Sequence, residues 1–183
     1  MRFGVVAPSV QAIQEQVLGR RHDELTGLLA GLEGRAELGL KAIWPEDLIM
    51  REIVEEASPA MRRLRDKMQG KSVEQSYYDR LSLGEMIEAA MGKKRDEEAE
   101  RILRRLLPLT EDHQLNALHL DRMVLNAAFL VKRERQGEFD AAVQQLDEEL
   151  GTRVTFRYVG PVPPYNFVSV AIIWDEEQAG GGV

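Results

Sequence analysis

The sequence predicts an α+β protein with a ferredoxin-like β-α-β-β-α-β domain on its C-terminal side, a helical insertion in that domain, and a partial α/β element before it. Between residues 35 and 159, segments with an apolar residue at every second position alternate with segments in which apolar residues recur every three or four positions. Their order is strand, helices, two strands, helix, strand, which is the split β-α-β arrangement. A continuous apolar run at 123–131 predicts a strand buried on both faces.

The chain has 183 residues, of which 44% are hydrophobic, so it can form the core of one domain or of two small ones. Its net charge of −7 argues against general nucleic-acid binding. The absence of cysteine excludes disulfides, thiolate metal sites and cysteine nucleophiles. No apolar run approaches the roughly 20 residues of a membrane span. We therefore expect a cytoplasmic protein.

The first 44 residues predict the remnant of an N-terminal α/β domain. Residues 3–7 are β-branched and aromatic and predict a short strand, which Pro8 ends, and Ser9 is a suitable helix N-cap. A helix over 10–32 follows from the helical spacing of Val10, Ile13, Val17, Leu25, Leu28, Leu29 and Leu32. Alternating apolar and polar residues after Gly34 predict a strand over 35–43.

Residues 45–110 predict a helical region. A short apolar stripe follows Pro45, and Ser58-Pro59 restarts the helix with a serine cap and a first-turn proline. The sequence Ser72–Gln75 matches a capping box, so a third helix begins there and extends to residue 107, with a break near 82–84. Residues 93–105 carry charges of both signs, which predicts a solvated helix face.

Residues 111–174 predict the C-terminal α+β part. We expect a loose strand over 113–120, a turn at 121–122, and the buried strand over 123–131. An amphipathic helix over 138–150, a strand over 153–159 and a strand over 167–174 complete it. Residues 175–183 are acidic and glycine-rich and predict a flexible tail.

The segment Gly160–Val168 has the most distinctive local sequence, because three of its four residues from 161 to 164 are prolines. Prolines fix φ and remove backbone donors, so the segment is neither a helix nor a central strand. It is either a rigid connector between strands or a docking surface of preformed extended backbone. As a docking surface, its candidate partner-binding residues are Pro161, Pro163, Pro164, Tyr165 and Phe167. Burial of Tyr165 and Phe167 as a clip between domains is the competing hypothesis.

The sequence offers little for catalysis. It contains no nucleophile elbow, P-loop or dinucleotide-binding glycine pattern. His113 and His119 share a parity on the predicted strand and, with Asp112 or Asp121, are the alternative for a small metal-dependent enzyme. Their spacing matches no established ligand pattern, so we expect no catalytic, metal-binding or cofactor-binding residues. A generic ferredoxin-like interaction domain with exposed strand edges is a further alternative.

The nonapeptide Gly-Pro-Val-Pro-Pro-Tyr-Asn-Phe-Val closely resembles the Gly-Pro-x-Pro-Pro-Tyr-x-Phe-Val signature of the gas vesicle protein F/L family. Further similarity to that family lies, in order, at Arg2–Val6, Glu37–Lys41, Tyr77–Arg80, Asp121–Val131 and Phe156–Pro161. The resemblance therefore extends through nearly the whole chain.

This resemblance implies a non-enzymatic accessory or minor structural protein of gas vesicle assembly. It implies a location in the cytoplasm and at the gas vesicle, and association with the small hydrophobic shell protein and with other accessory proteins. Members of the family usually carry several tens of residues before the strand that matches Arg2–Val6, so this sequence resembles a form without the first part of the N-terminal domain. An unpaired edge at residues 3–6 would then favour self-association.

Overall fold

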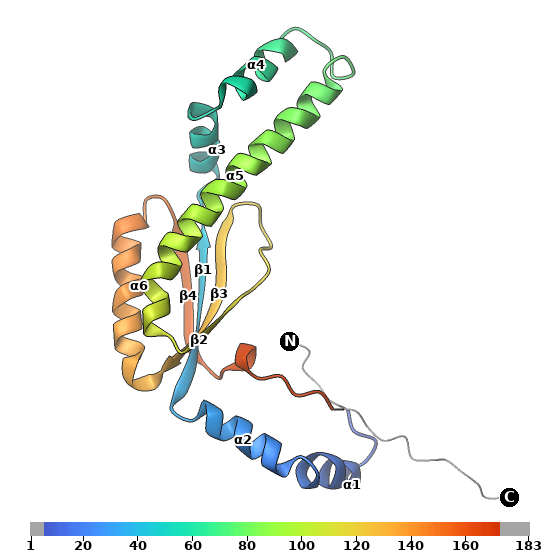
Figure 1. The fold of residues 1–183 in the computed structure, drawn as a ribbon, viewed down its shortest axis with the longest axis vertical. Helices are drawn as coiled ribbons and strands as arrows, with labels where there is room; N and C mark the ends of the chain where they lie inside the picture. The colour runs from blue at the N-terminus through green and yellow to red at the C-terminus, as the bar shows by residue number, and fades with distance from the viewer. Residues whose placement is uncertain (1–5, 173–183) are drawn as a thin grey trace, which may run out of the picture.

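The computed structural model describes residues 6–172, which form a four-stranded antiparallel sheet with helices on one of its faces (Figure 1). The strands lie in the order β2-β3-β1-β4. Read from the other edge, this is the ferredoxin-like order 4-1-3-2, and the predicted fold class is confirmed. The strands are β1 (Arg35–Ile43), β2 (Asp112–Leu115), β3 (Met123–Lys132) and β4 (Thr155–Val162).

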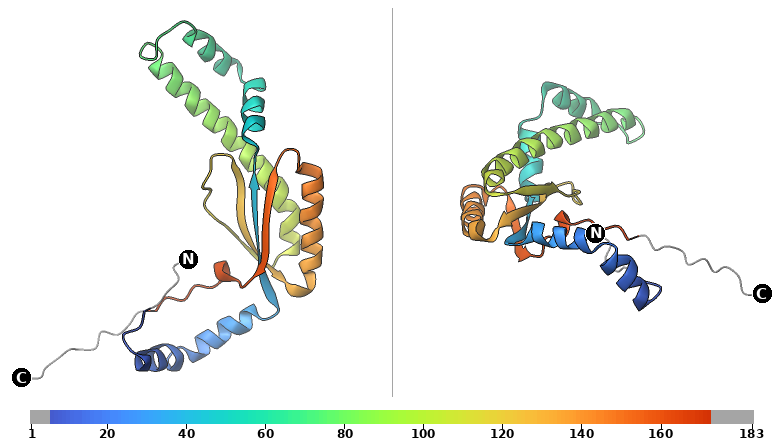
Figure 2. Two further views of the ribbon diagram at one scale, coloured as in Figure 1. Left: turned by 180° about the vertical axis from the view of Figure 1, so that it is seen from behind. Right: turned by 60° about the horizontal axis from the view of Figure 1, so that its bottom comes forward.

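The helices divide into three groups. The N-terminal group is α1 (Val10–Ala12), the π-helical turn η1 (Ile13–Gly19) and α2 (His22–Leu32). The inserted group is α3 (Glu46–Glu55), α4 (Pro59–Met68) and α5 (Tyr77–Leu106), and α6 (Gln136–Leu150) connects β3 to β4. Short 3-10 turns lie at Leu107–Leu109, Arg133–Arg135 and Tyr165–Phe167. The last part of α5 and α6 cover the sheet face that lies away from α2 (Figure 2).

The core lies between the sheet and α5 and α6. Leu38, Leu40 and Ala42 alternate along β1, and they lie opposite Phe129, Ala127 and Leu125 of β3 in the strand register. Because alternate side chains point to the same face, these residues all face the helices. They pack there against Ile102, Leu106, Phe139, Val143 and Leu146, each of which is less than 9% exposed.

The helix caps that the sequence predicts are present. The hydroxyl of Ser9 accepts a hydrogen bond from the backbone N–H of Ala12, and that of Ser58 accepts one from Met61 at 3.2 Å. Ser72 and Gln75 exchange two hydrogen bonds of 3.3 Å, as in a capping box. This capping box closes a turn, and α5 itself begins at Tyr77. The break predicted near residues 82–84 is absent, because α5 is continuous there.

Three further predictions differ from the structure. The predicted helix over 10–32 is interrupted by a turn at Arg20 and Arg21, and the predicted strand over 113–120 ends at Leu115. Residues 168–172 form no strand, because the chain leaves the sheet after Val162 and runs towards α2. The Arg21 guanidinium donates there to the Ala171 carbonyl at 2.5 Å. Of the predicted first strand, residues 3–5 lie outside the described residues, and residues 6–7 have no regular structure. The predicted tail at 175–183 also lies outside the described residues.

The inserted helices form an arm that projects beyond the sheet (Figure 1). An ion cluster fixes its base, where the Arg153 guanidinium pairs with Glu52 of α3 and, at 2.6 Å, with Glu98 of α5. The ammonium of Lys94 pairs with Glu52 at 3.1 Å and also with Glu56. The sequence predicted that the charge run at 93–105 is a solvated face throughout. Glu98 is only 7% exposed, so part of the run instead faces inward and forms the ion pairs of this cluster.

Candidate functional site

The nonapeptide begins inside the sheet and ends outside it. Its first residues complete β4, an edge strand with a bulge in its pairing to β1, where proline is tolerated. Gly160 has a φ of 144°, and a Cβ atom there would lie 2.8 Å from the Cδ2 atom of Leu38. This position therefore requires glycine. Residues 163–168 then turn across the end of the sheet, and we call this segment the proline bend.

A buried carboxylate holds the proline bend in place. Glu37 points to the sheet face opposite Leu38 and is 5% exposed. Its carboxylate accepts hydrogen bonds from the backbone N–H of Asn166, at 2.8 Å, and from the Asn166 side-chain amide. Charge-assisted bonds of this kind are stronger than neutral ones, and they compensate the cost of burying the charge. Sequence reasoning missed both residues, although an acid within an apolar strand was the available signal.

The candidate partner-binding residues differ in exposure. Pro161 and Pro163 are exposed, and Pro164 and Phe167 are half-buried. The Tyr165 side chain keeps 46% of its surface accessible, so the hypothesis that it is buried as a clip is wrong. Phe167 is half-buried and lines a hollow beside α2. The bend therefore presents Pro163 and Tyr165 outward on a fixed backbone.

One hollow, of about 750 Å³, lies on the sheet face that α5 and α6 leave open. Gly39 and Ala128 lie opposite one another in neighbouring strands and form its floor, where small side chains leave the backbone accessible. Lys41 and Arg157 supply positive charge and Glu37 negative charge. Asn166 of the proline bend lines it, together with Leu40, Asn116, Ala117, His119, Asn126, Ala127 and Val159. We call it the sheet-face hollow.

A second hollow, of about 440 Å³, lies on the other side of the proline bend, between α2 and the end of the sheet. Its apolar lining is Leu28, Leu32, Leu130, Phe167 and Val168, and its glycines are Gly27 and Gly31. Its charged side chains are Asp23, Glu24 and Asp112. We call it the α2 groove. It is open because α2 buries none of its own residues.

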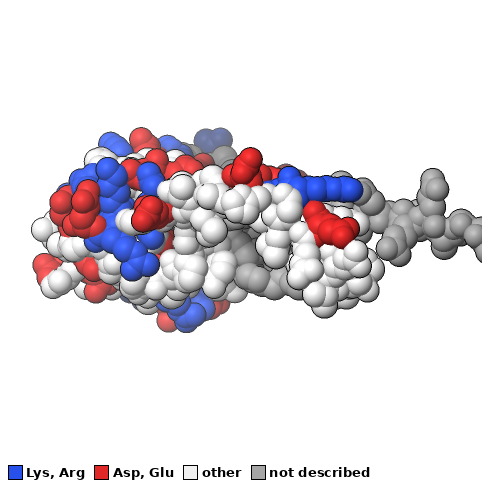
Figure 3. All heavy atoms as spheres, turned by 90° about the horizontal axis from the view of Figure 1, so that it is seen from below, with Lys and Arg blue, Asp and Glu red and all other residues white. Residues whose placement is uncertain are grey.

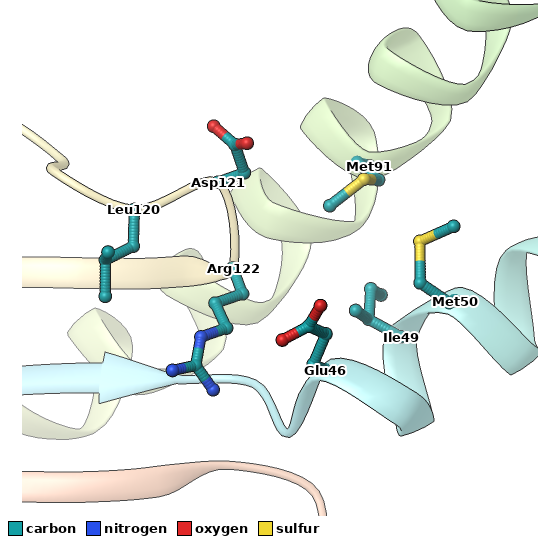
Figure 4. A pocket seen from close by; sticks show the side chains of 7 residues that line it. All are labelled: Glu46, Ile49, Met50, Met91, Leu120, Asp121 and Arg122. Atoms are coloured by element: carbon teal, nitrogen blue, oxygen red, sulfur yellow. The ribbon is translucent and has the colours of Figure 1, made fainter.

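A third hollow, of about 340 Å³, lies at the base of the arm (Figure 4). Met50 and Met91 approach it from α3 and α5, and Leu120 from the loop before β3. Arg122 and Glu46 also line it, from the turn before β3 and from the start of α3. The mixed charges and small size give this hollow no evident ligand.

The structure does not bring the two histidines into a ligand set. His113 lies on β2, whereas His119 lies beyond the strand's end and lines the sheet-face hollow, so the shared parity on one strand was wrong. Among residues 6–172, no three His, Asp or Glu side chains are grouped as a metal site requires. Burial, with a hydrogen bond to Asp140, raises the pKa of Tyr158, which anchors β4 to α6.

The chain matches the family model described as Gas vesicle synthesis protein GvpL/GvpF over residues 1–169. Gas vesicle protein F of Dolichospermum flosaquae is 26% identical over 170 residues, which cover 93% of this chain and 68% of the relative. Gas vesicle protein F of Haloferax mediterranei is 42% identical over 74 residues, covering 40% of this chain and 35% of the relative.

Two crystal structures share the fold. The gas vesicle protein GvpF from Anabaena sp. PCC7120 superposes with a TM-score of 0.80 at 24% identity, over 94% of this chain and 69% of that one. GvpF from Microcystis aeruginosa gives a TM-score of 0.75 at 25% identity, over 93% and 69%. This chain thus spans about two thirds of the length of these relatives.

Proposed function

The chain belongs to the gas vesicle protein F/L family, and we propose that it acts in gas vesicle assembly by binding the small hydrophobic shell protein through the proline bend and the sheet-face hollow. Other accessory proteins of the gas vesicle are its further partners in this proposal. The protein works in the cytoplasm and at the gas vesicle, without catalysis and without a cofactor. In the described part of the chain, no helix has both the length and the apolarity to cross a membrane.

The observation that carries this proposal is the fixed geometry of the proline bend. Glu37 holds Asn166 in place, so the bend loses little conformational entropy when a partner binds. Exposed Pro163 and Tyr165 then lie beside a hollow large enough to take several apolar side chains. Tyrosine and proline supply rigid contact area of the kind found in peptide-binding surfaces.

The floor of the sheet-face hollow fits an extended segment. Gly39 and Ala128 carry no large side chain, so a partner's backbone can approach the sheet closely. Arg157 at the side offers hydrogen-bond donors to backbone carbonyls of such a segment, whereas the Asn126 amide already donates to the Ala117 carbonyl. A hydrophobic shell subunit that is not yet assembled presents apolar extended segments, and binding here would keep them from aggregating.

Co-expression with the shell protein tests this proposal. We expect the shell protein to stay soluble and to co-purify with the wild-type chain, and to precipitate with the Pro163→Ala, Tyr165→Ala double variant. Val54→Ala, which shortens an apolar side chain that is 61% exposed on the arm, is the control and should behave as wild type. Urea unfolding of each variant separates lost binding from lost folding.

Two results contradict the proposal. If the double variant binds normally per folded molecule, the shell protein uses another surface. If the wild-type chain fails to hold the shell protein while a full-length gas vesicle protein F relative succeeds, the described part of the fold does not suffice for binding. The relative thus serves as the positive control for the assay.

A further inference from the structure

The tip of the arm is basic in an acidic protein. We define the arm tip as residues 59–81, which comprise α4, the turn after it and the start of α5. Residues 59–80 hold six lysines and arginines but three acids, a net charge of +3 in a chain whose total is −7. Two of the acids are already paired, Asp66 with Arg65 at 2.9 Å and Asp79 with Lys67 at 2.8 Å.

Several cations of the arm tip remain available. Arg62 and Arg63 are exposed on α4 and, among the described residues, neither pairs with a carboxylate; Arg62 donates only a 3.4 Å bond to the Glu55 carbonyl. Lys71, in the following turn, is exposed and likewise has no carboxylate partner within residues 6–172. Positive charge is thus displayed at this end of the molecule.

The arm tip also exposes large apolar side chains. Tyr77 and Tyr78 are 58% and 79% exposed, and their rings meet edge to face at 5.3 Å. Val73 and Leu81 beside them are 62% and 52% exposed. Tyrosine and arginine are the residue types that most often anchor protein interfaces, so this combination is typical of a contact surface.

The α2 groove has the complementary character. Its lining is apolar, its charged side chains are all acidic, and no basic residue lines it. Glu24 pairs with Arg21, which leaves Asp23 and Asp112 as the negative charges that no lysine or arginine neutralises in the described structure. Gly27 adds no side chain to the helix surface, so a ring can lie directly on the backbone. Seen from this end, most of the surface near α1 and α2 is uncharged (Figure 3).

We propose that the arm tip of one copy of this protein docks into the α2 groove of a second copy. The two surfaces lie at opposite ends of the longest axis, so one molecule cannot join them by itself (Figure 1). A volume of about 440 Å³ accommodates a tyrosine ring with a neighbouring aliphatic side chain. The contact is head to tail, and repetition of such a contact builds chains or rings of molecules. Phe167 and Val168 of the proline bend line the groove, so this contact lies beside the surface proposed for the shell protein.

A charge exchange tests this contact on the full chain. In the tip variant, Arg62→Glu and Arg63→Glu make both ends of the molecule acidic. In the groove variant, Asp23→Lys and Asp112→Lys make both ends basic. Each variant alone should self-associate at least about tenfold more weakly than wild type, because like charges then face one another. An equimolar mixture should restore association, since each variant's tip complements the other's groove.

Sedimentation velocity is the measurement, at low and at high ionic strength. Wild-type assemblies should shrink as salt increases, because the charges that steer the contact are exposed and screened. Gly27→Leu should also weaken assembly by filling the groove, whereas Gly137→Leu on α6 should not. A Cβ atom at either glycine meets no atom within 4 Å, so both substitutions fit the fold. Urea unfolding confirms that each variant is folded.

Three outcomes overturn the proposal. The first is a wild-type protein that stays monomeric at every concentration and ionic strength. The second is assembly that Gly27→Leu disrupts while the tip variant leaves it unchanged, which would assign the groove to α2–α2 pairing. The third is a mixture of the two charge variants that associates no better than either variant alone.

Discussion

Replacing Glu37 by glutamine should loosen the proline bend while leaving the sheet folded. The carboxylate is 5% exposed and accepts two bonds from Asn166. Glutamine keeps the shape, and its oxygen can still accept from the backbone N–H, but its NH₂ group faces the Asn166 amide as donor against donor. One charge-assisted bond is lost, which corresponds to about 2 kcal/mol in the free energy of opening the bend.

Hydrogen exchange at the Asn166 backbone N–H measures this opening directly, since that amide donates to Glu37. A change of about 2 kcal/mol corresponds to roughly thirtyfold faster exchange of that amide. Amides of β3 report global unfolding and should change little. Glu111→Gln is the matched control, because it also removes a carboxylate that pairs across the fold, with Arg35, away from the bend.

A double-mutant cycle with Asn166→Ala completes the test. The two substitutions should show a coupling energy of about 1 kcal/mol or more, because they remove the same interaction. Unchanged exchange in Glu37→Gln, or a coupling energy near zero, would show that Glu37 does not position the bend. The proline bend would then not be held in a fixed conformation before the shell protein binds.

Three further changes follow from the structure. Arg153→Met leaves the carboxylate of Glu98, which is 7% exposed, without its guanidinium partner and should cost roughly 3 kcal/mol in urea unfolding. The hydrogen bond from Arg153 holds the pKa of Glu52 below its ordinary value of 4.5, so the Glu52 carboxylate contributes fully to stability above about pH 4.5. The free energy of unfolding, measured as a function of pH, should fall below that pH. It should fall less in Arg153→Met, which lacks the hydrogen bond. Gly160→Ala forces a Cβ atom into β1 at a φ of 144° and should lower the free energy of unfolding in urea by about 1–3 kcal/mol, whereas Gly137→Ala on α6 should be neutral or slightly stabilising.

The fold class could be predicted because the sheet has one apolar face. Leu38, Leu40 and Ala42 repeat at period two, which selects a strand and identifies its buried side. The continuity of α5 could not be predicted, because Gly84 suggests a break locally. Packing of Leu83 and Met86 against the core outweighs the cost of about 1 kcal/mol for a helical glycine.

The contacts that position the candidate site are long-range, and local sequence patterns do not contain them. Glu37 and Asn166 are 129 residues apart, and each is ordinary in its own context. The ion cluster shows the same limit, since Lys94 and Glu98 sit in a charge run that looks uniformly solvated. Only the path of the chain brings Arg153 to Glu98 and Glu52 to Lys94. The nonapeptide itself was recognisable, whereas the residue that holds it was not.

The open face of the sheet is a second physical argument for a binding role. A face meant only to meet water usually carries long polar side chains, which cover the backbone and keep other strands away. Here the centre of that face is Gly39 beside Ala128, and the charged residues Lys41 and Glu37 flank them. A glycine at the centre of a strand lowers its stability, because glycine loses more conformational entropy on folding and has no side chain that could pack against its neighbours. Such a face permits close approach of another backbone, and Asn166 of the proline bend lines the same hollow.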